Sequence, residues 1–316
     1  MQIVKPEVKI IDEFDPYKKI ERIGRICYKS EDKITDKSAI PFVNGLKEHH
    51  HFAMLEHSYL HFAFEANPNN IDLFEAFANI PGIIITRWIG DLYLISVSLS
   101  HLYNPKWEYC SYMLDLRHWF EYIYEDVSGN RQLKLPDDVK IKRLNHVEDF
   151  QEVAGKYDPT YVPSADDMEK LIQKHRVVSI YFKCCRGVSH ELVRHRCSAA
   201  QSSTRYCNYS KAKFGSEITF IEPSTYNTWS QDVRQKFEDY LENCESLYMY
   251  MISSGLQPQQ ARAILPNALM TEVVLTMSID RWKHFINLRS IGTTGAPHPD
   301  MKVVADKAKE LLTDIF

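Results

Sequence analysis

Residues 194–206 read RHRCSAAQSSTRY and concentrate cationic and hydroxyl side chains in a short span. An arginine guanidinium presents a planar fork of donors that matches phosphate oxygens, and hydroxyl and backbone N–H groups can complete such a cradle. Because Arg194, His195 and Arg196 are adjacent, they cannot share one helix face, which predicts a helix end or a loop. The segment is therefore a candidate anion site. For the triplet alone, a solvated basic turn is the alternative.

Two more arginines lie in helical patterns nearer the C-terminus. Arg289 closes an apolar stripe of Trp282, Phe285 and Ile286, and a charge at such a position needs a partner or a pocket. The position would equally suit an arginine that reaches solvent and caps its own helix. Arg262 lies in ARAILP, where the alternative is an ordinary exposed side chain.

Histidines are dense in EHHHFAMLEHSYLH, residues 48–61. One interpretation is a metal site made by His49, His51, His57 and His61. However, His57 and His61 have an even spacing on a predicted strand, and no carboxylate motif of the metallohydrolase type accompanies them. We therefore expect no metal.

The composition is typical of a soluble globular protein. The 316 residues are 44% hydrophobic and 25% charged, and the formal net charge of −4 argues against a broad nucleic-acid surface. The seven cysteines have no repeating spacing, MQIVKPEVKI lacks a long apolar core, and Arg87 and Asp91 interrupt the apolar residues 80–99. We expect a reduced, cytoplasmic protein with no signal peptide and no membrane span.

The elements that would position these residues follow from periodicity. Apolar spacing predicts a helix over 15–30, and alternation predicts a strand over 58–66. A second strand is expected over 177–185, followed by a short helix that Ser189 would cap. In the C-terminal third we expect a helix ending at Gly255, a helix over 256–266, a strand over 269–278, a helix over 280–289 and a final helix from Met301.

Residues 67–175 form a separate block between the two predicted strands. The block opens with NPNN, has a predicted turn at 89–91 and contains the aromatic-rich stretch WEYCSYMLDLRHWFEYIYED, which has a helical pattern. No chemical motif is visible in it. We expect a structural or interfacial role.

Several of these motifs occur in an order that resembles the flavin-dependent thymidylate synthases. The family signature is RHR, seven residues, then S-x-R-Y, which RHR and Ser203-Thr204-Arg205-Tyr206 resemble. GRICYKS, HFAMLEH, VSHELVRHR, ARAILP, HFINLR and APHPDM are similar to other family segments. The resemblance covers roughly 15–66 and 176–310 and skips the central block.

The resemblance implies an FAD-dependent reductive methylation of dUMP to dTMP, with methylenetetrahydrofolate and NADPH as co-substrates. It makes Arg289 the catalytic residue, which would polarise the uracil ring without help from a cysteine nucleophile. The dUMP-binding residues would be Glu191, Arg194, Gln201, Ser203, Thr204, Arg205, Arg262 and Arg289. The FAD-binding residues would be His57, Tyr59, Arg194, His195, Arg196, Gln201, Ser278, Asp280 and His284.

The implied fold is α+β, a twisted antiparallel sheet flanked by helices, with a large central insertion. The family domain would comprise 1–66 and 176–316, and 67–175 would be an insertion of unknown role. The insertion would leave at the end of the strand over 58–66, return beside it and lie outside the active site. The family also implies a homotetramer with shared active sites, acting on small molecules rather than on nucleic acid or membranes.

Three departures from the family pattern keep alternatives open. The spacer CSAAQS is one residue shorter than usual, Glu191 replaces a glutamine, and Ser278-Ile279-Asp280 stands where the family has N-x-R, a loss that Arg281 could compensate. A related pyrimidine nucleotide, or hydroxymethyl transfer, is therefore an alternative. Rivals of other classes are a non-catalytic nucleotide- or RNA-binding module and a histidine metallohydrolase.

Overall fold

The computed structural model describes residues 1–65, 82–104, 140–160, 163–212, 215–313 and 315. Its N-terminal elements are β1 (Gln2–Val4), β2 (Glu7–Ile10), α1 (Pro16–Tyr28), α2 (Ala39–Glu48), α3 (Phe52–Leu55), β3 (Tyr59–Glu65), β4 (Ile83–Ile89), β5 (Leu92–Ser98), α5 (Leu99–Tyr103), β6 (Lys140–Leu144), α7 (Phe150–Tyr157) and α8 (Ala165–His175). The later elements are β7 (Val177–Cys185), α9 (Arg186–Leu192), β8 (Ser198–Gln201), β9 (Thr219–Ile221), α10 (Gln231–Ser253), α11 (Pro258–Ala261), β10 (Met270–Ser278), α12 (Ile279–Ile286), a π-helical turn (Asn287–Ile291) and α13 (Pro299–Leu312).

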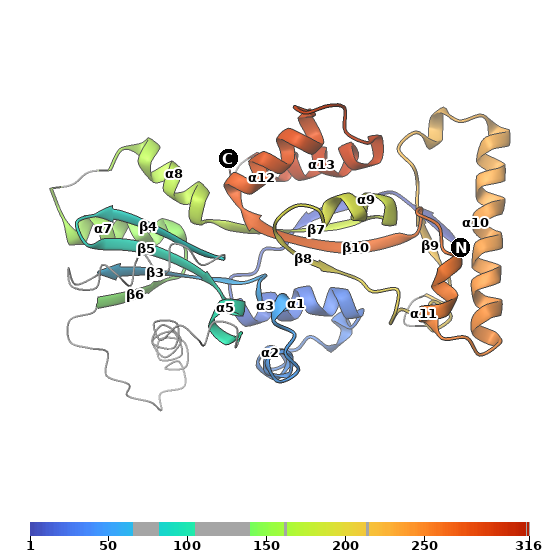
Figure 1. Cartoon of the computed structure of the whole chain (residues 1–316), viewed down its shortest axis with the longest axis horizontal. Coiled ribbons are helices and arrows are strands. Elements are labelled where there is room, and N and C mark those ends of the chain that lie inside the picture. The colour runs from blue at the N-terminus through green and yellow to red at the C-terminus, as the bar shows by residue number, and fades with distance from the viewer. Residues whose placement is uncertain (66–81, 105–139, 161–162, 213–214, 314, 316) are drawn as a thin grey trace.

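The central sheet is antiparallel and has the strand order β2-β7-β10-β8. Strands β7 and β10 pair along their full length, from Val177 opposite Ser278 to Cys185 opposite Met270. Most residues of both strands are buried because helices cover both faces of the sheet. Figure 1 shows α9, α12 and α13 on one face and α1, α2 and α3 on the other.

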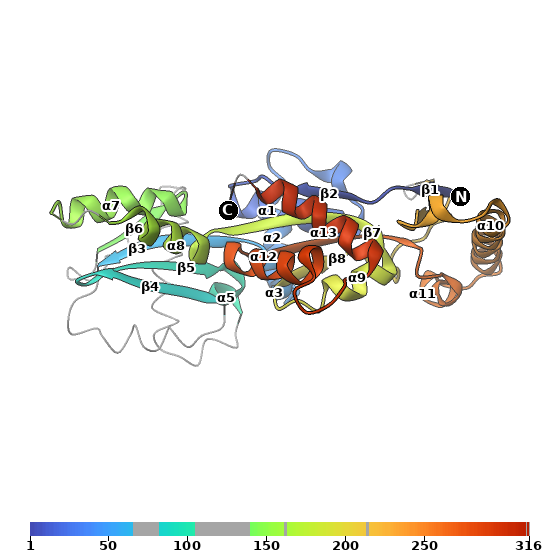
Figure 2. The same ribbon diagram turned by 90° about the horizontal axis from the view of Figure 1, so that it is seen from above.

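A second antiparallel sheet has the order β4-β5-β3-β6. Its inner strand β3 pairs with β5 and with β6. The β4–β5 hairpin turns at Gly90, whose φ of 53° lies in the left-handed region. Figures 1 and 2 place this sheet at one end of the molecule and α10 at the other, beside the short parallel pair of β1 and β9.

Most of the elements expected from periodicity are present. The predicted strands over 58–66, 177–185 and 269–278 correspond to β3, β7 and β10, and α10 is followed by Gly255 with φ of 93°. The predicted turn at 89–91 is also confirmed. The expected fold class is confirmed in its broad form, as mixed helices and antiparallel sheets. The aromatic-rich stretch WEYCSYMLDLRHWFEYIYED lies outside the described residues.

Two expectations about local structure are wrong. Ser189 does not cap α9: it lies inside the helix and its hydroxyl donates to the carbonyl of Arg186, while Cys185 occupies the N-cap. The chain was expected to return from the block beside the strand over 58–66, but the strand that follows the block, β7, pairs with β2 and β10, whereas β3 pairs with β5 and β6 in the second sheet. The division of the chain at residues 67 and 175 stays a prediction.

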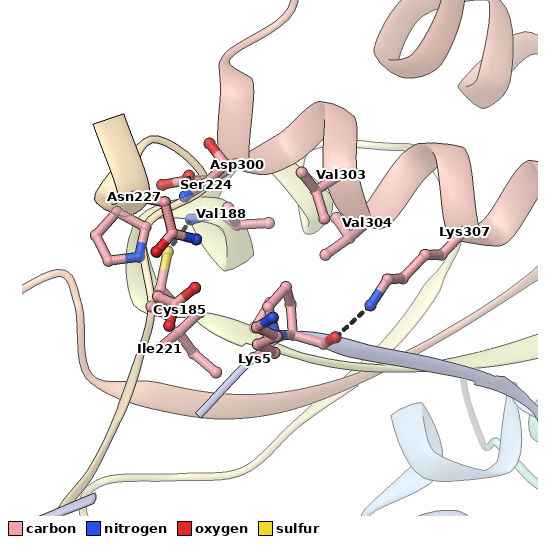
Figure 3. Close-up of a pocket in the computed structure, with 14 residues that line it drawn as sticks. Lys5, Cys185, Val188, Ile221, Ser224, Asn227, Asp300, Val303, Val304 and Lys307 are labelled. Carbon is pink, nitrogen blue, oxygen red and sulfur yellow. Dashed lines mark hydrogen bonds between the residues drawn. The ribbon is translucent and has the colours of Figure 1, made fainter. Parts of the chain in front are cut away.

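A small cavity of about 250 Å³ lies where the start of α13 meets the end of β7. Figure 3 shows Cys185, Asp300 and Lys307 around it, with the ammonium of Lys307 donating to the carbonyl of Pro6 at 2.6 Å. None of the residues predicted to bind nucleotide or flavin lines this cavity.

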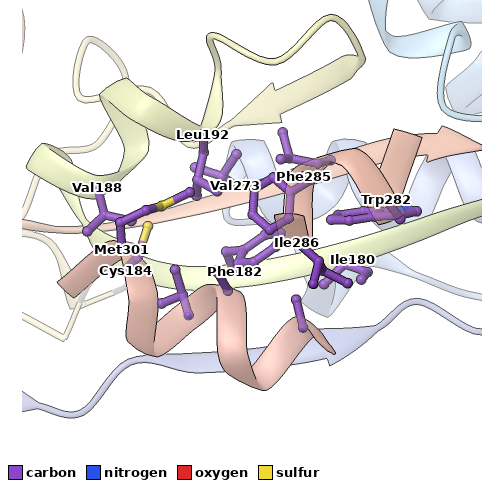
Figure 4. Packing of buried hydrophobic residues seen from close by; sticks show 14 of the residues in the cluster. Ile180, Phe182, Cys184, Val188, Leu192, Val273, Trp282, Phe285, Ile286 and Met301 are labelled. Atoms are coloured by element: carbon purple, nitrogen blue, oxygen red, sulfur yellow. The ribbon is translucent and has the colours of Figure 1, made fainter. Parts of the chain in front are cut away.

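The main core lies between the central sheet and the helices α9, α12 and α13. Figure 4 shows Phe182 of β7 beside Trp282 and Phe285 of α12. The rings of Phe182 and Trp282 stack with centroids 6.2 Å apart, and Phe285 meets Trp282 edge-on at 5.3 Å. The indole N–H of Trp282 donates to the carbonyl of Val178 at 3.1 Å, so α12 is fixed to β7 by packing and by a hydrogen bond.

We expect Trp282→Phe to lower the free energy of unfolding by about 2–3 kcal/mol, because it leaves a cavity and removes the donor to Val178. Denaturant unfolding would measure the loss. Trp229→Phe is the control, because Trp229 is only half-buried and its N–H donates to Thr225 on the surface. Equal losses in the two variants would contradict the structural role of Trp282.

None of the described helices is both long and apolar enough to span a membrane.

Candidate functional site

The Arg-His-Arg triplet lies in the turn between α9 and β8, as predicted. Strand β8 begins at Ser198, which pairs with Thr276 near the end of β10. Helix α12 starts directly after β10, so the turn before β8 must lie beside α12. The result is a cavity of about 390 Å³ lined by Arg194, His195, Arg196, Met277, Arg281, His284, Leu288 and Arg289.

Arg289 is held at this cavity by two side chains from the α9 region. Its Nε donates to Nε2 of His195 at 3.2 Å, and its Nη1 donates to a carboxylate oxygen of Glu191 at 2.7 Å. Arg289 and Glu191 are 24% and 25% exposed, so their ion pair is partly screened from water. The predicted need of Arg289 for a partner is thus confirmed, and the partner is Glu191.

The π-helical turn Asn287–Ile291 carries Arg289. Such turns are uncommon and are frequent at functional sites. The turn ends at Gly292, whose φ of 78° lies in the left-handed region. A side chain there would also approach the carbonyl oxygen of Gly295 to 2.9 Å, so this backbone requires glycine.

His195 is neutral at physiological pH. Burial, followed by the electrostatic effect of Arg289 and then of His284, lowers the pKa of His195 to about 4. The hydrogen bond from Arg289 also requires an unprotonated Nε2 on His195, in agreement with that pKa. The ring of His195 meets Phe285 edge-on with centroids 4.9 Å apart, which fixes its orientation.

Four of the predicted dUMP-binding residues, Ser203, Thr204, Arg205 and Arg262, form a second group. Arg262 donates to the hydroxyl of Thr204 at 3.2 Å, which joins two segments that sequence alone does not connect. The hydroxyl of Ser203 accepts from the backbone N–H of Arg205 at 3.3 Å. Arg205 is exposed, and its guanidinium lies 5.4 Å from the ring centroid of Tyr206. Arg205 lines neither the cavity at Arg289 nor the larger one beside it.

Gln201 lies between the two groups. Its side-chain amide donates to the hydroxyl of Ser189 on α9 at 2.9 Å and to that of Thr271 on β10 at 3.2 Å. These contacts hold the end of β8 against α9, which also carries Glu191.

A larger cavity of about 880 Å³ adjoins the first and shares Arg196, Met277 and Arg281 with it. The predicted flavin residues Tyr59, Arg196, Ser278 and Asp280 line it. Together the two cavities collect seven of the predicted flavin residues, namely Tyr59, Arg194, His195, Arg196, Ser278, Asp280 and His284.

His57 lines neither of these two cavities. It is fully buried, and its Nδ1 lies 2.7 Å from the hydroxyl of Thr276, which in turn contacts Ser179 at 2.7 Å. Burial lowers the pKa of His57 to about 3, so its ring is neutral. Its Nε2 is buried without a hydrogen-bond partner in the described part of the chain.

Sequence reasoning missed the outer wall of the larger cavity. This wall comes from the block 67–175 and consists of Gly82, Ile83, Ile84, Ser98, His101 and Lys174. These residues of the block therefore lie beside the predicted flavin residues, while the expectation that the block lies outside the active site stays a prediction. The types of these residues carried no signal, because isoleucine, glycine and an isolated lysine are ordinary in any strand or helix.

The histidines of residues 48–61 are dispersed. His61 lies on β3 with its Nδ1 2.6 Å from Ser96, whereas His49 and His51 lie near the end of α2. Among the described residues, no three His, Cys, Asp or Glu side chains gather in a group that could hold a metal ion.

One cysteine, Cys197, lines the larger cavity. Burial raises the pKa of its thiol to about 11, so the reactive thiolate is scarce at neutral pH. Cys184 and Cys185 are buried, and Cys197 is half-buried.

The fold is thus mixed α/β with antiparallel sheets, and its site offers several cationic donors to an anionic ligand. Residues 166–316 match the family model described as thymidylate synthase complementing protein. The match includes the Arg-His-Arg turn, β10 and Arg289.

Curated relatives carry the name flavin-dependent thymidylate synthase. The relative from Thermococcus onnurineus is 33% identical over 121 residues, which are 38% of this chain and 48% of that protein. The relative from Pyrococcus furiosus is 35% identical over 107 residues, or 34% of this chain and 43% of that protein. The chain spans about half the length of these relatives.

Solved structures of the UMP/dUMP methylase PolB from Streptomyces cacaoi superpose on part of the chain. One, bound with 5-Br dUMP, has 17% sequence identity and a TM-score of 0.38 and covers 52% of this chain and 88% of its own. Another, bound with 5-Br UMP, has a TM-score of 0.39.

The neutral state of His195 predicts a titration. The unfolded imidazole takes up a proton near pH 6.5, whereas the folded one does so only near pH 4. Between these values the unfolded state binds more protons, so the contribution of His195 to the free energy of unfolding falls as the pH falls from about 6.5 to about 4. NMR of the ring should give a midpoint near 4.

The matched variant is His195→Gln, which keeps an acceptor for Arg289 but cannot titrate. It should lose less stability than the wild type between pH 7 and pH 4.5, measured by denaturant unfolding. A wild-type midpoint at or above pH 6 would contradict the burial of His195.

Proposed function

We propose that this protein is a flavin-dependent thymidylate synthase, which methylates dUMP to dTMP using FAD, methylenetetrahydrofolate and NADPH. The observation that carries the proposal is the position of Arg289, whose guanidinium lines a cavity with Arg194, Arg196 and Arg281. The names of the relatives support the same activity. A homotetramer with shared active sites and a cytoplasmic location belong to this proposal.

The two adjoining cavities suit a flavin dinucleotide in donor chemistry. Arg194, Arg196 and Arg281 would hold its phosphates, because arginine donors match phosphate oxygens in geometry and charge. The neutral ring of His195 and the phenol of Tyr59 would flank the ring system. A bound flavin would supply the redox chemistry of the reaction.

Arg289 would act on the uracil ring of dUMP. A guanidinium in a partly buried cavity stabilises negative charge that develops on the ring, and so favours attack from C5 on the one-carbon unit. Arg289 is suited to this role because two hydrogen bonds fix its orientation before any ligand binds. Cys197 is a poor rival as a nucleophile, since its pKa is raised to about 11.

Glu191 would moderate this electrostatic effect. Its carboxylate accepts a hydrogen bond of 2.7 Å from Arg289 and would therefore lie near the nucleotide that Arg289 would bind. A negative charge there opposes both the phosphate and the developing charge on the base. Glu191 would therefore position Arg289 at some cost in affinity for dUMP.

The central test is flavin content and turnover. Purified protein should be yellow, NADPH should bleach the flavin absorbance, and dUMP with methylenetetrahydrofolate should yield dTMP. Arg289→Ala should reduce dTMP formation by a factor of at least about 100, because the uracil contact is lost, while flavin reduction persists because Arg194, Arg196 and Arg281 still hold the flavin phosphates. Lys309→Ala, at an exposed position of α13, is the control. Unchanged dTMP formation in Arg289→Ala would contradict its role.

A second variant tests Glu191. Glu191→Gln keeps a hydrogen-bond acceptor for Arg289 and removes the negative charge, so dUMP should bind about three- to tenfold more tightly. Isothermal titration with dUMP would measure the change at low and high salt. Weaker binding in this variant would mean that the carboxylate itself contacts the nucleotide favourably.

A further inference from the structure

The outer wall of the larger cavity has no role in the function proposed above. This wall, made by Gly82, Ile83, Ile84, Ser98, His101 and Lys174, comes from β4, α5, α8 and their neighbours. It faces Arg196 and Arg281, which line both cavities. A ligand that begins at Arg289 and passes these two arginines must therefore enter the space that the wall encloses.

The wall presents a fixed aromatic ring. The Nδ1 of His101 lies 2.6 Å from the hydroxyl of Ser98, and the ring lies directly against Gly82. A Cβ built on Gly82 would approach Cε1 of His101 to 2.1 Å, and the φ of 91° at Gly82 is also unfavourable for other residues. Glycine at this position therefore allows the ring of His101 to lie at the cavity, beside the apolar side chains of Ile83 and Ile84.

The wall also presents one cation. The ammonium of Lys174 donates to the hydroxyl of Thr86 at 2.9 Å and to the carbonyl of Ile85 at 3.2 Å. Thr86 is itself fixed by Nε2 of His175 at 2.8 Å. An ammonium has three N–H donors, so Lys174 is positioned by two and can offer the third to a ligand.

Two carboxylates, those of Glu56 and Asp280, also line this cavity. Because these carboxylates repel an anion, the cations Arg196, Arg281 and Lys174 must lie close to the negative groups of an anionic ligand. An aromatic surface, an apolar patch and a separate cation match a nucleoside phosphate, in which a planar base and a charged group are joined by a sugar.

We propose that this wall binds the adenosine monophosphate half of the flavin dinucleotide. The inference rests on the proposed function for the presence of flavin and adds wall residues that, apart from Lys174, lie outside the family match. Arg196 and Arg281 lie where the two cavities join and contact the diphosphate. Lys174 contributes the outer charge, and His101 with Ile83 and Ile84 contacts the base. These described residues of the block 67–175 are then part of the cofactor site.

The test compares FAD with FMN, which lacks the adenosine monophosphate half. We expect Lys174→Gln to weaken FAD binding about five- to tenfold and to leave FMN binding unchanged, as measured by equilibrium dialysis of the full chain. Glutamine can still donate to Thr86, so the variant removes charge with little disturbance of the sheet. Lys174→Ala should give the same pattern, and a thermal melt verifies that each variant is folded.

Lys170→Ala is the matched control. Lys170 is one turn earlier on α8, is exposed, and pairs with Asp166 on the surface. It should change neither affinity. Equal effects of Lys174→Gln on FAD and FMN, or no effect on either, would overturn the inference while leaving the proposed function intact. A wild-type protein that binds neither flavin would overturn both.

Discussion

The antiparallel pairing of β7 with β10 is the constraint on which the site depends. Helix α9 leaves β7 at Cys185, beside Met270, whereas α12 leaves β10 at Ser278, beside Val177. The two helices therefore start from opposite ends of the pair. The chain after α9 must cross the sheet to begin β8 opposite Thr276, and this crossing brings the Arg-His-Arg turn to α12. The long side chain of Arg289 then reaches both Glu191 and His195.

Electrostatics limits how many cations such a site can gather. Arg194, Arg196, Arg281 and Arg289 line one cavity, and a protonated histidine among them would add a further positive charge. Burial and the neighbouring charges keep His195 neutral, which lets it accept from Arg289. Glu191 offsets part of the remaining charge. The site therefore keeps enough positive charge to attract an anion, although His195 is neutral and Glu191 is negative.

The sequence predicted the elements with strong periodicity and the turn that carries the triplet. Strands β7 and β10 were predictable because their apolar runs are bounded by polar residues and turns, and Arg289 because a charge interrupts an apolar stripe. Its partner was not predictable, since Glu191 is 98 positions away and only the pairing of β7 with β10 brings them together. Ser189 was misassigned because a hydroxyl can cap a helix or bond back to it, and both roles suit the same residue.

The second sheet shows a different limit of sequence reasoning. β3 was predictable as a strand, but strand alternation says nothing about which partner a strand will choose. Its choice of β5 and β6 places the block beside the predicted flavin residues. Glycine, isoleucine and lysine gain their role at the cavity only through this long-range pairing, so no local pattern could have identified them.

The wall is positioned by the central sheet through two connections. At the first connection, His57, which lies two residues before the start of β3, contacts Thr276 of β10. The backbone N–H of Leu99 donates to the carbonyl of the neighbouring residue Ser58. At the second, His175 contacts Ser96 and Thr86 of the second sheet, and the next residue, Arg176, accepts from the backbone N–H of Ile279 at the start of α12. Since both connections are buried or hydrogen-bonded, the second sheet cannot shift without disturbing β10 or α12. The same elements that place Arg289 therefore also fix the distance across the larger cavity.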